Sequence, residues 1–212
     1  MNADAALEDD DASPQGLWRA LRGFIFDLWG VFGAPERVAR QEWLSRAEYL
    51  TLRTWLRGCE KILRQLIFLD AVNLPRLPRL ARSTRPKHTR ATPPPRPDNL
   101  DNPESWRVSF CVAYARRPRP WARREPRERP GLYPALPLAR RMEALRRGFN
   151  APHQHARRLA RFIHADRENV ARHLLHLPRD NPDLPKQFLL RWMEFARAHV
   201  AALIAAPCPD TG

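Results

Sequence analysis

The chain has 212 residues, of which 43% are apolar, so one domain or two small ones with a true hydrophobic core are possible. Its formal net charge is +14, and 34 of the 37 basic residues are arginine. Three widely separated cysteines and only eight glycines argue against a disulfide scaffold, a zinc site and a glycine-rich phosphate loop. No uncharged apolar run approaches the ~18 residues of a membrane-spanning helix, and the acidic N-terminus does not resemble a signal peptide, so we predict a cytoplasmic protein.

The N-terminal region begins with an acidic stretch, residues 1–12, which we expect to be a disordered tail. Ser13 and Pro14 then form a helix-start signal, with the serine as N-cap and the proline in the first turn. The following residues, 15–32, are strongly apolar, and Gly33 ends the run. The sequence therefore predicts a helix here.

This first helix has two interpretations. The preferred one is that its wide apolar face packs on the next helix of the chain. The alternative is a helix lying in a membrane surface, with its tryptophans and phenylalanines at the acyl boundary and Arg19 and Arg22 at the headgroups. Asp27 and the small number of cations count against the alternative.

The stretch Pro35–Val72 is predicted to be one long amphipathic helix. Apolar side chains recur along it at helical spacing: Leu52, Trp55, Leu56, Cys59, Leu63 and Leu66, extended upstream by Trp43, Ala47 and Leu50. Glutamate precedes arginine by four residues at Glu36–Arg40, Glu42–Arg46 and Glu60–Arg64. The stripe is wider than one short helix can cover, so either the C-terminal helices or a second chain must cover it. We predict Trp43, Trp55 and Leu63 as interaction residues.

A three-residue repeat follows the long helix at residues 74–85, LPR-LPR-LAR-STR. Polyproline II has three residues per turn, so in that conformation leucines and arginines would lie along separate edges. We predict that Leu74, Leu77 and Leu80 pack against protein and that Arg76, Arg79, Arg82 and Arg85 face outward as anion-binding residues. The competing explanation is a chance pattern in an arginine- and proline-rich composition.

Residues 73–137 form a Pro/Arg-rich linker that holds fourteen of the 22 prolines and a charge of +10. Within it, residues 106–114, WRVSFCVAY, alternate between large apolar and smaller or polar side chains, which is typical of a strand. This segment could pair with residues 132–136, pair edge to edge with a second copy, or pack as an extended arm on the helices.

The C-terminal region, 138–206, returns to helical spacing, and residues 207–212 are expected to fray. Helices are predicted from Leu138 to Phe149, from about Pro152, from about Asp166 to Leu177, and from about Pro185 to Ala205. His173 and His176 are three residues apart on a predicted helix, as metal ligands can be, but we interpret them as residues at the edge of the core. No cofactor or metal is expected.

Together these patterns predict a mainly α protein with helical bundle-like packing around the long helix, one isolated strand-like segment and the Pro/Arg-rich linker. No catalytic motif is present, so we predict a non-enzymatic protein-interaction or scaffold role, with another protein or a second copy as partner. The alternative is binding to an anionic surface, either nucleic acid through the arginine-rich middle or a membrane surface through the first helix. Coding bias toward arginine, alanine and proline is a competing source of the basic excess.

Overall fold

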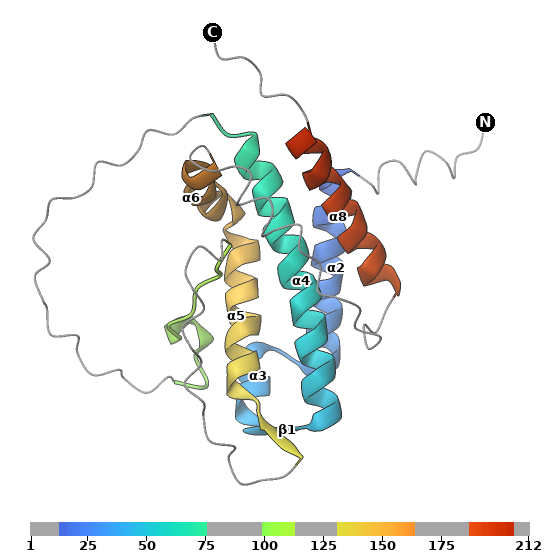
Figure 1. Ribbon diagram of the computed structural model, residues 1–212. Coiled ribbons are helices and arrows are strands. Elements are labelled where there is room, and N and C mark those ends of the chain that lie inside the picture. The colour runs from blue at the N-terminus through green and yellow to red at the C-terminus, as the bar shows by residue number, and fades with distance from the viewer. Residues whose placement is uncertain (1–12, 76–98, 113–130, 164–186, 206–212) are drawn as a thin grey trace, which may run out of the picture.

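The computed structural model describes residues 13–75, 99–112, 131–163 and 187–205. Helix α4, Arg46–Val72, runs through the middle of the molecule, with α2 and α8 along one side and α5 and α6 along the other (Figure 1). The described part of the chain is therefore mainly α, as the sequence predicts. No described helix is both long and apolar enough to cross a membrane.

Helix α2, Pro14–Phe32, confirms the first predicted helix. The Ser13 hydroxyl accepts a hydrogen bond from the Gly16 backbone N–H over 3.0 Å and so caps the first turn. The helix ends at Gly33, whose φ of 87° lies in the region that favours glycine. Leu17, Leu21 and Leu28 are buried on the face turned to the core. The helix therefore packs its apolar face on the rest of the protein, as the preferred interpretation predicts.

The prediction of one uninterrupted helix from Pro35 to Val72 is wrong. A short helix, α3, spans Pro35–Arg40; a strand, β1, spans Trp43–Ser45; and α4 then begins at Arg46. Glu42, between α3 and β1, has a φ of 56°, which an α-helix does not allow.

A local sequence signal marks the new helix start. The Glu48 backbone N–H donates to the Ser45 hydroxyl over 3.2 Å, and the Ser45 N–H donates to the Glu48 carboxylate over 2.9 Å. This reciprocal capping box fixes the N-terminus of α4 at a Ser-x-x-Glu pattern that hydrophobic periodicity alone overlooks. The predicted Glu42–Arg46 pair straddles the break, and Arg40 pairs with Asp101 over 2.8 Å.

The remaining elements pack around α4. They are β2 (Leu132–Pro134), α5 (Leu136–Asn150), α6 (Pro152–Ile163) and α8 (Gln187–Ala205). Strand β2 pairs antiparallel with β1, with Leu44 opposite Tyr133. Helices α2, α5, α6 and α8 all contact α4, so the chain itself covers the apolar stripe, which is the first of the two alternatives. Leu63 is 0% exposed.

The segment 99–112 lies against α5 as an extended arm (Figure 1). It contains one short 3₁₀ turn, η1, Pro103–Ser105, and no ladder pairing within its described residues. The predicted alternation is visible in burial: Trp106, Phe110 and Val112 are buried, while the residues between them are half-buried or exposed. Residues 106–112 therefore pack on the helices as an extended arm, which is the third of the three alternatives. Strand β2 pairs with β1 and not with this segment.

Candidate functional site

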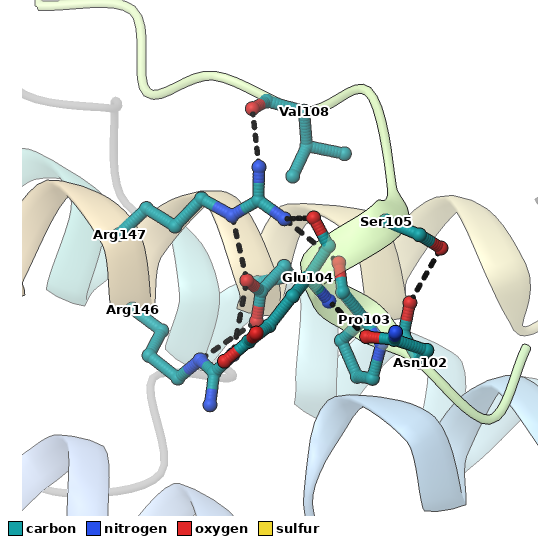
Figure 2. Close-up of polar contacts among 8 residues, drawn as sticks. Asn102, Pro103, Glu104, Ser105, Val108, Arg146 and Arg147 are labelled. Atoms are coloured by element: carbon teal, nitrogen blue, oxygen red, sulfur yellow. Dashed lines mark hydrogen bonds and ion pairs between the residues drawn. The ribbon is translucent and has the colours of Figure 1, made fainter.

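An arginine on α5 fastens the extended arm to the helices (Figure 2). Nη2 of Arg147 donates to the backbone oxygen of Pro103 over 2.7 Å and to that of Glu104 over 3.1 Å, and Nη1 donates to that of Val108 over 3.3 Å. Nε of the same guanidinium donates to Glu143 over 2.7 Å, whose side chain is 0% exposed. One side chain thus binds three backbone carbonyl groups of the arm.

A second arginine holds the other end of the arm. Nε of Arg64, on α4, donates to the backbone oxygen of Cys111 over 3.0 Å, and its guanidinium lies 5.2 Å from the centre of the Phe110 ring. The Phe110 ring packs so closely on Gly148 of α5 that a Cβ there would lie 2.7 Å from the ring. The arm is therefore held by hydrogen bonds to its backbone and by the packing of buried side chains, among them Trp106 and Phe110.

Arg64 also belongs to a charged group shared between α4 and α5. Its Nη2 lies 3.2 Å from one carboxylate oxygen of Glu60, which confirms the predicted Glu60–Arg64 pair. Nε of Arg141, on α5, lies 3.0 Å from the other oxygen. Both oxygens of this largely buried carboxylate are thus engaged by arginines.

Two further arginines, Arg53 and Arg57, lie on the preceding turns of α4. Partial burial lowers the pKa of Arg57, and the positive charges of Arg53 and Arg141 lower it further. Glu60 acts in the opposite direction. Within the described residues, neither Arg53 nor Arg57 has a hydrogen bond or an ion pair with a carboxylate. We call Arg53, Arg57 and Arg141 the arginine face.

An aromatic pair lies at the same end of the molecule. The rings of Tyr49, on α4, and Tyr133, on β2, stack with their centres 4.6 Å apart and their planes 19° apart. Tyr49 precedes Arg53 by one helical turn, and it is among the groups that act on the pKa of Arg57. The arginine face and the tyrosine pair therefore form one surface of α4, α5 and β2.

The predicted interaction residues have separate locations. Trp55 and Leu63 are core residues, Trp43 is half-buried in β1, and Leu74 is half-buried against the core. Leu77 and Leu80, and the predicted anion-binding residues Arg76, Arg79, Arg82 and Arg85, lie outside the described residues.

The structure describes Cys59 but not His173 and His176. Cys59 is buried, as expected for an inert thiol, and burial raises its pKa to about 12. In the described part of the chain, no three histidine, cysteine, aspartate or glutamate side chains gather as metal ligands would. His173 and His176 lie outside that part.

The arginine face was not among the residues predicted from the sequence. In the sequence, Arg53 and Arg57 occupy polar positions of an amphipathic helix, which gives them no distinguishing pattern. Arg141 is more than eighty residues away from both. Only the packing of α5 on α4 brings the three together. Neither protein-family models, nor curated proteins, nor solved structures match the chain.

Proposed function

We propose that the protein has a non-catalytic binding role and that its arginine face binds a phosphate-rich polyanion, single-stranded nucleic acid. The observation that supports this most strongly is the shortage of acidic partners around Arg53 and Arg57. Glu60, the carboxylate that acts on Arg57, already engages Arg64 and Arg141 through its two oxygens. A phosphate would supply the missing negative charge.

The chemistry of the side chains favours nucleic acid over a simple anion. Arginine presents a planar set of donors that matches phosphate, and it stacks on bases as lysine does not. Tyr49 and Tyr133 place aromatic rings beside these cations, and arginines next to aromatic rings are typical of surfaces that bind single strands.

The test is a titration of a labelled single-stranded oligonucleotide, about 20 nucleotides long, followed by fluorescence anisotropy at low salt. The test variant replaces Arg53 and Arg57 with glutamine. A matched control replaces the exposed residues Arg22 on α2 and Arg191 on α8 with glutamine, which removes the same charge elsewhere on the surface. We expect the test variant to bind about tenfold more weakly or worse, and the control to lose less than about threefold.

Equal losses in the two variants would show that only net charge matters and would contradict the proposed face. Unchanged binding in the test variant would place the nucleic acid elsewhere, and the predicted Arg76, Arg79, Arg82 and Arg85 would be the next residues to replace. A Tyr49→Leu variant separates the aromatic contribution, since it should weaken binding of single strands more than binding of duplex.

A second candidate, contact between two copies of the chain, is favoured by a specific observation on α2. Phe26 and Val31 are 61% and 65% exposed, although the opposite face of the helix is buried in the core. Trp18 and Trp29, which a membrane-surface helix would present to lipid, are instead partly buried against the core. Light scattering on wild type and Phe26→Ser would show a dimer that the substitution dissociates, and a wild-type monomer at high concentration would refute it.

A further inference from the structure

A small pocket lies where the last turn of α4 meets the beginning of α6. Its volume is about 270 Å³, below the roughly 300–1,000 Å³ of pockets that hold drug-sized ligands. It is lined by Asp70, Asn73, Leu74, His153, Ala156 and Arg157. Its size is suited to a small metabolite rather than a dinucleotide or another large cofactor.

Four polar residues line this pocket: Asp70, which is half-buried, and Asn73, His153 and Arg157, which are exposed. Asp70 and Asn73 come from the end of α4, while His153 and Arg157 lie one helical turn apart on α6. Within the described residues, none of these four side chains has a hydrogen bond or an ion pair. The one interaction among them is the electrostatic effect of His153 on Asp70. Groups of opposite charge that line a cavity unpaired are arranged as in a binding site for a small polar molecule.

The acidic residue of the pocket lies on α4, which forms one wall, and the basic residues lie on α6, which forms the other. The carboxylate of Asp70 is half-buried, and burial raises its pKa while His153 lowers it, so the carboxylate is partly removed from water. Such a group gains more from a bound cation than a fully hydrated one does. On the α6 wall, the guanidinium of Arg157 offers two parallel donors to a carboxylate. Leu74 and Ala156 supply apolar surface between the polar groups.

We propose that this pocket binds a free α-amino acid. The ammonium group lies toward Asp70 and Asn73, the carboxylate toward Arg157 and His153, and a small side chain against Leu74 and Ala156. Neither a cation nor an anion alone would use both walls. The pocket lies about 20–25 Å along α4 from Arg57 and Arg53, at a rise of 1.5 Å per residue, so this proposal stands independently of the proposed function.

The test is isothermal titration of the full chain with each of the twenty standard amino acids, with putrescine as a cation-only probe and acetate as an anion-only probe. We expect at least one small amino acid to bind with a Kd of about 1 mM or lower, and both single-charge probes to bind at least tenfold more weakly. The variants Asp70→Asn and Arg157→Gln should each weaken that binding about tenfold or more.

Arg158→Gln is the matched control, because Arg158 is the next residue of α6, is exposed and does not line the pocket. It should bind within about twofold of wild type. Thermal melts recorded for all three variants confirm folding, since Asp70 and Arg157 have no bonds to lose within the described residues. Absence of binding by every amino acid at 10 mM would overturn the proposal, as would equal binding of acetate or putrescine, or unchanged affinity in both pocket variants.

Discussion

Arg141 on α5 reaches across to Glu60 on α4, with its Nε 3.0 Å from Oε1 of the carboxylate. The other oxygen of Glu60 accepts from Arg64, which in turn donates to the backbone of the extended arm at Cys111. A single acidic side chain therefore joins two helices and, through Arg64, the arm. The same arrangement leaves the arginine face with an excess of positive charge.

Substituting Glu60→Gln is expected to change stability and binding in opposite directions. Loss of the carboxylate leaves two partly buried guanidiniums without their counter-charge, which should lower the free energy of unfolding by about 3 kcal/mol. The same loss makes the arginine face more positive, so a labelled single strand should bind more tightly. Urea unfolding and anisotropy titration measure the two effects, and weaker binding by a folded variant would contradict the account.

The Arg147→Gln variant tests the attachment of the arm. It removes three hydrogen bonds from a charged donor to the carbonyls of residues 103–108, at an expected cost of about 3 kcal/mol. Arg146→Gln is the matched control, since Arg146 binds the same carboxylate, Glu143, and makes no hydrogen bond to the described residues of the arm. Hydrogen exchange should accelerate across residues 104–112 in the first variant and much less in the second; similar exchange in both would argue against the attachment.

Gly148→Ala is predicted to be destabilising, although alanine is the better helix former. The added Cβ would lie 2.7 Å from the Phe110 ring, and crowding of this kind costs about 1–3 kcal/mol. In a Phe110→Ala background the ring is absent and only the Cβ of residue 110, 2.9 Å from the added one, remains, so the same substitution should cost clearly less. A double-mutant cycle by thermal unfolding measures this coupling, and additive effects would show that the arm does not pack there as described.

Lys61 is expected to make stability rise with pH in mildly alkaline solution. Burial lowers its pKa to about 8, with contributions from Arg64 and Arg197, against 10.5 in the unfolded chain. Between these values the unfolded state binds more protons, so the free energy of unfolding should increase by about 1 kcal/mol from pH 7 to pH 9.

Lys61→Met isolates this contribution from that of other groups. The raised pKa of Cys59, about 12, has the opposite sign and lowers stability only above the thiol's ordinary pKa near 9. The difference in unfolding free energy between wild type and Lys61→Met should therefore change between pH 7 and 9. A constant difference would mean that the lysine titrates normally.

The fold could be predicted from the sequence wherever a local signal and the hydrophobic period agreed. Ser13, Pro14 and Gly33 bracket α2 because each supplies backbone chemistry that a helix end requires. The break at residues 41–45 was missed because the apolar period continues through it, while the capping box of Ser45 and Glu48 indicates a new start. In this case the capping box located the start of the helix and the hydrophobic period did not.

The arm and the arginine face show what sequence could not supply. Alternation at residues 106–112 correctly separates buried from exposed side chains, but whether a strand or an arm results depends on what satisfies the backbone. Here Arg64 and Arg147 bind those carbonyls, from positions more than thirty residues away. The convergence of Arg53, Arg57 and Arg141 likewise depends on how α5 is placed against α4, which no local pattern encodes.

The most direct test of the arginine face is the salt dependence of single-strand binding. Each phosphate contact on a single strand contributes about −0.7 to the slope of log K against log salt concentration. If Arg53 and Arg57 each engage a phosphate, the Arg53→Gln, Arg57→Gln variant should have a slope smaller by about 1.4, while the Arg22→Gln, Arg191→Gln control keeps the wild-type slope. Identical slopes in the wild type and the arginine-face variant would contradict the central claim.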